Sequence, residues 1–276
     1  MTEKTPPSSP RVIPARAWRS KDTMDLHLTG TTALLTGAAS GIGRATALAL
    51  AAEGVRVALL DRDAPALEQT AAAVRAQGGA DVLPFVVDLT AEEDVQGAVD
   101  AAIAELGHLD AVVCCAGISG PVGRGIEQTA LAEWNAVFAV NVTAAFLVLR
   151  QALPALRAAA SASVVLLSSD SAFVASPGMA PYAASKAALV QFARALSVDL
   201  GGTGIRVNTV APSIVDTPMS RGDLGAEAFD APAFPVQSAD EVAAHVVYLV
   251  SPRSRAISGT TLLSDFGFSA RSGFPA

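Results

Sequence analysis

Tyr182 and Lys186 are the pair of residues in this sequence with the clearest potential for chemistry. They stand four positions apart in the apolar stretch PYAASKAALVQF, residues 181–192, so on a helix both side chains lie on one face. A free phenol keeps its proton at neutral pH, but a nearby ammonium favours the phenolate and lowers the pKa. The spacing predicts a tyrosine acid/base whose pKa is lowered toward working pH. A packed tyrosine beside a lysine that extends to solvent is the structural alternative.

Two further polar residues lie in apolar surroundings. Ser169 ends the apolar run ASVVLLSSDS, and ligands of open α/β sheets bind beyond the carboxyl ends of strands. Its hydroxyl is a candidate donor to a substrate oxygen, although serine is also an ordinary turn residue. Asn141 lies in the helical pattern WNAVFAVNVTAAFLVLR. A buried amide needs partners, so Asn141 is either a structural bridge or part of a polar relay.

The segment TGAASGIGRA joins an apolar run to a helical pattern and contains Gly37, Gly41 and Gly43. Such glycines permit a tight turn and a close approach of backbone to ligand. The following helix offers unpaired N–H groups and a partial positive charge, which suit a pyrophosphate. The spacing differs from the common G-x-G-x-x-G fingerprint. The segment therefore predicts dinucleotide binding, with a plain turn and helix cap as the alternative.

Asp61 ends the next apolar run, VALLD, eighteen residues after Gly43. A carboxylate at this position accepts hydrogen bonds from the adenosine ribose and repels a 2′-phosphate. We therefore expect NAD rather than NADP as the cofactor. Arg62 argues weakly the other way, because an arginine could turn toward a phosphate, and a surface turn is the bland interpretation of Asp61.

The elements that must position these residues follow a rhythm. Short apolar runs alternate with longer alanine-rich stretches of helical periodicity, which predicts parallel strands covered by helices on both faces. We expect a doubly wound, Rossmann-type α/β sheet of about seven strands in a single domain, residues 29–276. The Pro- and Ser-rich residues 1–28 predict a flexible N-terminal extension. The expected strands are TTALLTG, VRVALLD, DVLPFVVD, LDAVVCCAG, ASVVLLSS, GIRVNTVAP and GTTLLSDFG.

Composition limits the partners. Over 276 residues the net charge is −7, which argues against nucleic acid as a partner because phosphate binding needs a basic surface. No apolar run approaches the roughly 18 residues of a membrane span, and no secretory signal is evident. Cys114 and Cys115 are adjacent, so they are poorly placed to bridge each other, and they lack the companions of a zinc site. The expectation is a cytoplasmic protein with reduced thiols, no metal, and no membrane or nucleic-acid partner.

Together these motifs resemble the short-chain dehydrogenase/reductase family over about residues 28–269. The resemblance is carried by TGAASGIG at 36–43, VDLT with Asp88, Asn141, Ser169, YAASK at 182–186, RVNTVAP at 206–212, and VDTPM. It implies a catalytic tetrad in which Tyr182 is the general acid/base and Lys186 lowers its pKa and holds the nicotinamide ribose. Ser169 would orient the substrate oxygen, and Asn141 would hold a water in a proton relay.

The resemblance also implies contacts and assembly. Asp88 and Leu89 would contact adenine, Val215 and Thr217 the nicotinamide end. The family usually forms homotetramers or homodimers, partly through the helices that carry Asn141 and Tyr182. The full set of expected cofactor contacts is Gly37, Ser40, Gly41, Ile42, Gly43, Asp61, Arg62, Asp88, Leu89, Cys115, Gly117, Tyr182, Lys186, Val215 and Thr217.

This chain departs from the family pattern at three points. Cys114 and Cys115 replace two asparagines, so amide contacts are lost while backbone contacts to the adenine ribose can survive. Ser213 replaces a glycine after Pro212, and Phe266 replaces a glycine near the end.

The lid after VDTPM, SRGDLGAEAFDAPAFPVQ, is short and rich in Gly, Ala and Pro. We expect a mainly apolar substrate pocket. Asp170 and Arg221 are the nearest charged candidates, although solvated loop residues are the favoured interpretation of both. The expected apolar lining is Met219, Phe173, Met179, Phe229 and Phe234.

The expected function is an NAD(H)-dependent alcohol dehydrogenase or ketoreductase that interconverts a secondary alcohol and a ketone on a small-to-medium, largely apolar substrate. A catalytically silent nucleotide-binding sensor or scaffold of the same fold is the alternative. An epimerase or dehydratase is disfavoured, since such relatives tend to carry a larger C-terminal substrate domain.

Overall fold

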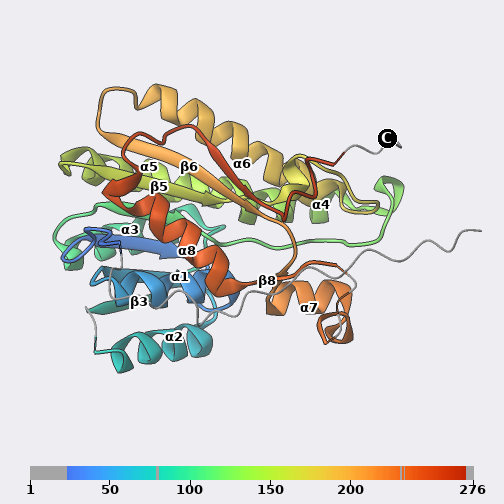
Figure 1. Cartoon of the computed structure of the whole chain (residues 1–276), viewed down its shortest axis with the longest axis horizontal. Helices are drawn as coiled ribbons and strands as arrows, with labels where there is room; N and C mark the ends of the chain where they lie inside the picture. The colour runs from blue at the N-terminus through green and yellow to red at the C-terminus, as the bar shows by residue number, and fades with distance from the viewer. Residues whose placement is uncertain (1–23, 79–80, 231, 233, 272–276) are drawn as a thin grey trace, which may run out of the picture.

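Seven parallel strands form the central sheet of the computed structural model, which describes residues 24–78, 81–230, 232 and 234–271 (Figure 1). Their order is β3-β2-β1-β4-β5-β6-β9, and each neighbouring pair is parallel. This confirms the doubly wound sheet expected from the sequence. The strands are β1 (Thr32–Thr36), β2 (Arg56–Asp61), β3 (Val82–Val86), β4 (Ala111–Cys114), β5 (Ala162–Leu167), β6 (Ile205–Pro212) and β9 (Thr261–Ser264).

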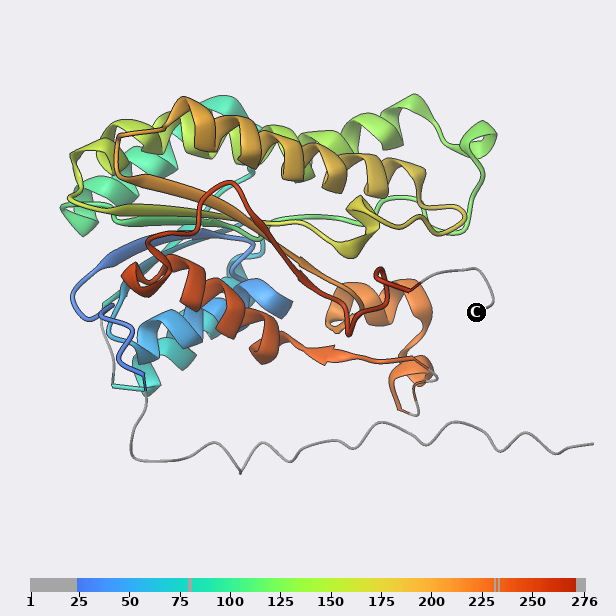
Figure 2. The same cartoon turned by 45° about the horizontal axis from the view of Figure 1, so that its top comes forward.

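Helices cover both faces of the sheet, as Figure 2 shows. On one face lie α1 (Gly41–Ala52), α2 (Ala64–Ala76) and α8 (Ala239–Val250). On the other lie α3 (Glu92–Leu106), α5 (Ala144–Ala158) and α6 (Ala180–Asp199), with α4 (Leu131–Phe138) leading into α5. Each face has its own hydrophobic cluster.

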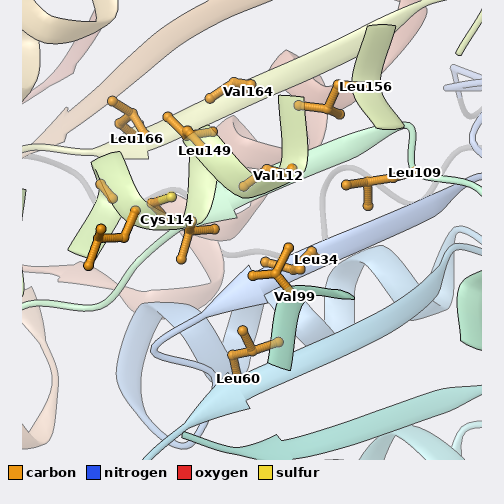
Figure 3. Close-up of a cluster of buried hydrophobic side chains, with 14 of the residues drawn as sticks. Leu34, Leu60, Val99, Leu109, Val112, Cys114, Leu149, Leu156, Val164 and Leu166 are labelled. Atoms are coloured by element: carbon orange, nitrogen blue, oxygen red, sulfur yellow. The ribbon is translucent and has the colours of Figure 1, made fainter. Parts of the chain in front are cut away.

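The strands are apolar on both sides because both faces of the sheet are covered. All five residues of β1 and all six of β5 are buried. Figure 3 shows one of the two clusters, in which strand side chains such as Leu34 and Val112 meet helix side chains such as Val99 and Leu149. Cys114 belongs to this cluster as a small apolar side chain.

The chain reverses its winding direction between β1 and β4, which are neighbours in the sheet. The loops that follow these two strands therefore leave toward opposite faces and open a crevice at the carboxyl edge, where doubly wound sheets bind ligands.

The helical stretch Leu131–Ala158 is longer than the sequence pattern indicated. It joins α4 and α5 through η3 (Ala139–Thr143), a single π-helical turn that the sequence analysis did not predict. By length and composition this stretch is apolar enough to cross a membrane, so the expectation that no such run exists was wrong. In this fold α5 instead packs on the sheet, with Leu147, Val148 and Leu149 buried.

The lid begins and ends in a second, two-stranded sheet that the sequence analysis missed. β7 (Val215–Asp216) pairs in parallel with β8 (Gln237–Ser238). Between them lie α7 (Pro218–Leu224) and η5 (Ala226–Phe229). Because β7 follows β6 directly, the lid stands at the carboxyl edge of the main sheet, at the right of Figure 2.

The last residues of the predicted N-terminal extension are attached to the domain. Leu28 is buried, the Ser251 hydroxyl donates to the Leu26 carbonyl at 2.7 Å, and Arg253 donates to the Asp25 carbonyl at 2.9 Å. Residues 1–23, including Trp18, lie outside the described residues.

Candidate functional site

A cleft of about 360 Å³ runs along the carboxyl edge of the sheet. It is lined by loops that follow six of the seven main strands and by the start of the lid. All but one of the residues predicted for the site line it: Gly37, Ser40, Gly41, Ile42, Gly43, Asp61, Arg62, Asp88, Leu89, Cys115, Gly117, Ser169, Tyr182, Lys186, Val215 and Thr217. The exception is Asn141.

The glycine loop folds so tightly that side chains would not fit. Gly37 has φ of 69°, and a β-carbon on it would lie 2.6 Å from the Ala116 nitrogen. A β-carbon on Gly43 would lie 1.9 Å from the Gly37 carbonyl oxygen. Ser40 precedes α1 without capping it through its side chain. Ser40 and the first residues of α1 line the cleft, and a helix N-terminus with free N–H groups suits phosphate groups.

Asp61 ends β2 with its carboxylate held by the main chain. Oδ2 accepts a hydrogen bond from the Ala39 nitrogen at 3.0 Å, and Oδ1 accepts one from the Asp63 nitrogen at 3.1 Å. These bonds fix a negative charge between the glycine loop and the start of α2. The adjacent Arg62 is exposed and helps to lower the pKa of Asp88, after the larger effect of hydrogen bonds from Thr90.

Tyr182 and Lys186 lie one turn apart on α6 and both line the cleft. The Lys186 ammonium is buried, donates to the Leu167 carbonyl at 2.9 Å, and lies 5.5 Å from the centre of the Tyr182 ring. Ser168 links the same strand end to the same helix, because its hydroxyl donates to the Lys186 carbonyl at 2.8 Å. These bonds anchor α6 against β5.

The pKa of Tyr182 differs from the sequence-based expectation. Burial raises the pKa of Tyr182 to about 12, with the Ser169 hydroxyl acting in the opposite direction and Asp170 and Asp223 raising it further. Burial also lowers the pKa of Lys186 to about 8. Lys186 therefore does not lower the pKa of Tyr182 in this structure, since loss of water dominates and the ammonium is bound to a carbonyl.

Ser169 is buried at the end of β5. Its Oγ accepts a hydrogen bond from the Ser171 nitrogen at 3.1 Å and donates to Asp170 Oδ1 at 3.0 Å. The hydroxyl also influences the Tyr182 phenol. The two residues that the sequence analysis assigned to the substrate oxygen are thus neighbours in space.

Asn141 lies behind the cleft, in the π turn. Its Oδ1 accepts from the Ile118 nitrogen at 2.8 Å, and its Nδ2 donates to the Ile118 carbonyl at 3.0 Å and to Ser185 Oγ at 2.9 Å. Both amide protons are therefore used within the protein, so the side chain is a structural bridge that fixes the loop after β4. Asn141 Oδ1 and Lys186 Nζ each lie 3.4 Å from the point where a β-carbon on Gly117 would be. The proton relay stays a prediction.

The two cysteines point to opposite faces of the sheet. Cys114 belongs to one hydrophobic cluster, while Cys115 packs against the other and lines the cleft. Both are free, and burial raises the pKa of the Cys115 thiol to about 12. Cys115 therefore offers the cleft a neutral thiol and its backbone. Within the described part of the chain, no three His, Cys, Asp or Glu side chains gather as a metal site requires.

The lid arranges its side chains differently from the expectation. Of the five predicted apolar lining residues, only Met219 lines the cleft. Arg221 donates to both oxygens of Asp216, at 2.6 and 2.8 Å, and stacks on Phe229. Asp223 Oδ1 accepts a hydrogen bond from the Ser119 hydroxyl at 2.9 Å. That bond joins the lid to the loop after β4.

Several cleft residues were not predicted. Most are direct sequence neighbours of predicted ones at strand ends, which is the signal that would have found them. Ser213, one of the departures from the family pattern, does reach the cleft, whereas Phe266 has φ of 55° and lies in the C-terminal turn. The additional lining residues are Ala39, Asp63, Val87, Thr90, Ala116, Ile118, Val140, Leu167, Ser168, Pro212, Ser213, Pro218 and Ser220.

Comparison with known proteins gives consistent matches over most of the chain. The family profile described as "Enoyl-(Acyl carrier protein) reductase" matches residues 37–269. D-threitol dehydrogenase of Mycolicibacterium smegmatis is 34% identical over 261 residues, which cover 90% of this chain and 96% of that protein. Cyclopentanol dehydrogenase of Comamonas sp. is 37% identical over 244 residues, covering 86% and 96%. The crystal structure of a short chain dehydrogenase from Mycobacterium paratuberculosis bound to NAD superposes with a TM-score of 0.81 at 29% identity, covering 88% and 99%.

Proposed function

We propose that this chain, which belongs to the short-chain dehydrogenase/reductase family, is an NAD(H)-dependent oxidoreductase that interconverts a secondary alcohol and a ketone. The observation that carries the proposal is one continuous cleft with Asp61 and the glycine loop at one end and Ser169, Tyr182 and Lys186 at the other. The two relatives named above are dehydrogenases of alcohols, D-threitol and cyclopentanol, and the solved neighbour binds NAD.

The residues present fit a dinucleotide. The N-terminus of α1 would hold the pyrophosphate, Asp61 the adenosine ribose, and Asp88 and Leu89 the adenine, with Cys115 and Gly117 contributing backbone. Lys186 would hold the nicotinamide ribose, and Val215 and Thr217 the nicotinamide end. When bound, the nicotinamide accepts or supplies the hydride. The tight contacts around Gly37 and Gly43 support this fit, because they leave the space next to the loop backbone free of side chains.

Tyr182 would transfer the proton between the phenol oxygen and the substrate oxygen. Ser169 would hold that oxygen by a hydrogen bond, since Ser169 and Tyr182 line the same cleft. The Ser169 proton, which donates to Asp170 Oδ1 in this structure, would turn to the substrate. Asn141 would act indirectly, because its amide fixes the loop at Ile118, next to Gly117 and Lys186. The proposed substrate is a small-to-medium secondary alcohol or ketone whose apolar body lies against Met219.

The test is formation of NADH by the purified protein with NAD⁺ and a panel of secondary alcohols. We expect Tyr182→Phe to lose this activity by at least about a hundredfold, the scale of general acid–base catalysis. Tyr248→Phe is the matched control, because Tyr248 is the second tyrosine of the chain and lies on α8, among residues packed against the hydrophobic cluster.

Full activity in Tyr182→Phe would refute the proposed role of the phenol. Binding of NADH without turnover of any alcohol would favour the alternative of a silent nucleotide-binding scaffold.

We also propose a cytoplasmic homotetramer or homodimer. Large apolar side chains are exposed on the helices expected to assemble, with 74% of Leu131, 45% of Phe146 and 78% of Val198 accessible. We propose that assembly through these helices, which the family resemblance implies, covers these side chains.

A further inference from the structure

A buried glutamine, Gln237, stands where the lid returns to the main sheet. Its side chain belongs to a residue that is only 4% exposed. It lies in β8, which leads from the lid into α8 (Figure 1). A buried amide needs partners for its two protons and for its oxygen, so the contacts of Gln237 show what holds the end of the lid.

The partners of Gln237 come from β9 and α8. Its Nε2 donates to the Ser264 carbonyl, and its Oε1 accepts a hydrogen bond from the Ser264 hydroxyl at 2.6 Å. The same hydroxyl lies 3.0 Å from His245 Nε2. We call Gln237, Ser264 and His245 the lid clamp, because they join β8, β9 and α8 at the end of the lid.

One carbonyl fixes the direction of every hydrogen bond in the lid clamp. A carbonyl only accepts, so the amide nitrogen of Gln237 must face the Ser264 carbonyl and the amide oxygen must face the Ser264 hydroxyl. The hydroxyl gives its proton to that oxygen, so His245 must donate from Nε2. Burial lowers the pKa of His245, against the opposite effect of Glu241, so at neutral pH the ring carries a single proton, on Nε2.

The lid clamp reaches the wall of the cleft through the main chain. The Ser264 carbonyl also accepts a hydrogen bond from the Ser213 nitrogen at 2.9 Å, and the Gln237 nitrogen donates to the Ile214 carbonyl at 2.9 Å. Val215 is the partner of Gln237 in the two-stranded sheet. Ser213 and Val215 line the cleft, whereas the three clamp residues are not among its lining residues. The clamp therefore holds residues 213–215 from behind the cleft.

We infer that Gln237 is a positioning residue for the nicotinamide end of the cofactor, because it fixes through Ser264 the cleft wall of residues 213–215 against which the nicotinamide would lie. This inference rests on the proposed function and adds to it a residue outside the cleft. Within the described residues, no hydrogen bond of the clamp side chains reaches Asp61 or the glycine loop. The clamp thus acts on one half of the dinucleotide site.

The experiment compares the affinities of the full chain for NADH and for ADP-ribose, which lacks the nicotinamide. Gln237→Glu keeps the shape of the side chain but replaces the amide donor by a carboxylate oxygen, which would face the Ser264 carbonyl without a proton. We expect the affinity for NADH to fall about tenfold, while ADP-ribose binds as it does to the wild type. Calorimetric titration measures both affinities, and a general loss of folding would weaken both ligands alike.

Gln96→Glu is the matched control, because it makes the same change at an exposed position of α3. Both of its affinities should equal those of the wild type. Gln237→Met serves as a second variant if Gln237→Glu does not fold, because it removes the amide without adding a charge. It should likewise weaken NADH more than ADP-ribose. Equal losses for the two nucleotides, or no loss for either, would overturn the inference.

A second measurement separates this inference from the proposed function, because it needs no cofactor. Hydrogen exchange of the free chain should become about tenfold faster at the Ser213 amide in Gln237→Glu, since that amide shares the Ser264 carbonyl with Gln237. The Val164 amide in β5 should exchange as in the wild type. Unchanged exchange at Ser213 contradicts the inference. A wild type that binds neither NADH nor ADP-ribose refutes the proposed function instead.

Discussion

Removal from water shifts the pKa values of Tyr182 and Lys186 in opposite directions. Burial disfavours the charged form of each group, so the phenol holds its proton more tightly and the ammonium holds its proton less tightly. The pKa of Tyr182 is about 12 and that of Lys186 about 8. At neutral pH the pair is thus a neutral phenol beside an ammonium, the protonation state that donates a proton to a ketone.

Replacing the buried ammonium changes how stability depends on pH. The folded pKa of Lys186 is about 8 and its ordinary value 10.5. Below pH 8 Lys186 is charged in both the folded and the unfolded chain, so the folded chain bears the full free-energy cost of burying the ammonium. Between pH 8 and 10.5 Lys186 is neutral in the folded chain and protonated in the unfolded chain, so the free energy of unfolding rises with pH. We expect Lys186→Met to relieve about 3 kcal/mol at pH 7, less about 1 kcal/mol for the lost bond to Leu167.

Urea unfolding at pH 7 and pH 10 measures this difference. The gain of Lys186→Met over the wild type should shrink at the higher pH. A gain that is the same at both values would show that the ammonium is not penalised in the folded chain.

Asp61 is expected to set the choice between NAD and NADP. Its fixed carboxylate would repel a 2′-phosphate, whereas the exposed Arg62 beside it would attract one. Asp61→Ala should raise the ratio of kcat/KM with NADP⁺ to that with NAD⁺ by at least about tenfold, the usual scale of one charged contact. Arg62→Ala should lower the same ratio. Initial rates with each cofactor measure it, and a ratio that is unchanged in both variants would contradict the role of Asp61 in the choice of cofactor.

The helices of this fold differ in how much space surrounds their glycines. The turn from β1 into α1 is closed by backbone contacts, whereas Gly97 lies on the exposed side of α3. The π turn η3 widens one turn of the α4–α5 stretch at Asn141, where the amide binds Ile118 on the neighbouring loop. A π turn at such a position often marks a functional site.

Two glycines allow this contrast to be tested. In Gly43→Ala the new β-carbon would lie 1.9 Å from the Gly37 carbonyl, so the loop must open and the affinity for NADH should fall about tenfold or more. In Gly97→Ala, at an exposed position of α3, the new carbon meets nothing within 4 Å, so stability should rise by about 1 kcal/mol with NADH affinity unchanged. Calorimetric titration and thermal unfolding report both effects. Equal NADH affinities of the two variants would contradict the proposal that the glycine loop binds the dinucleotide.

At the scale of the whole molecule, the strand order brings distant segments to one edge. The loops after β1 and β4 leave toward opposite faces of the sheet, where the winding direction reverses. The lid, which follows β6, lies at the same edge. Ser119 and Asp223 then join the lid to the loop after β4. The site therefore needs the complete sheet and lid, not any one βα unit.

Assembly is predicted to use the exposed apolar face of α4 and α5. Light scattering should give a mass of two or four times 27.9 kDa. The double change Leu131→Glu and Phe146→Glu should reduce that mass, because each buries a charge in the expected contact. Val86→Glu, at a 62% exposed position on the edge strand β3, should leave it unchanged. A monomeric wild type would contradict the prediction.

The sequence by itself determined the strand and helix periods, the order of the motifs and the family. These depend on local patterns, since apolar runs follow the periodicity of strands and helices, and Tyr182 and Lys186 share a face through spacing alone. For the same reason the glycine loop and Asp61 were found at the ends of their strands.

Only the tertiary structure decided the features that depend on long-range neighbours and on burial. It reversed the expected direction of the Tyr182 pKa shift, because desolvation depends on everything packed around the phenol. It showed Asn141 bound to Ile118, and it turned Arg221 toward Asp216. It also joined Asp223 of the lid to Ser119 after β4, which no spacing along the chain could reveal because the lid folds back over the sheet.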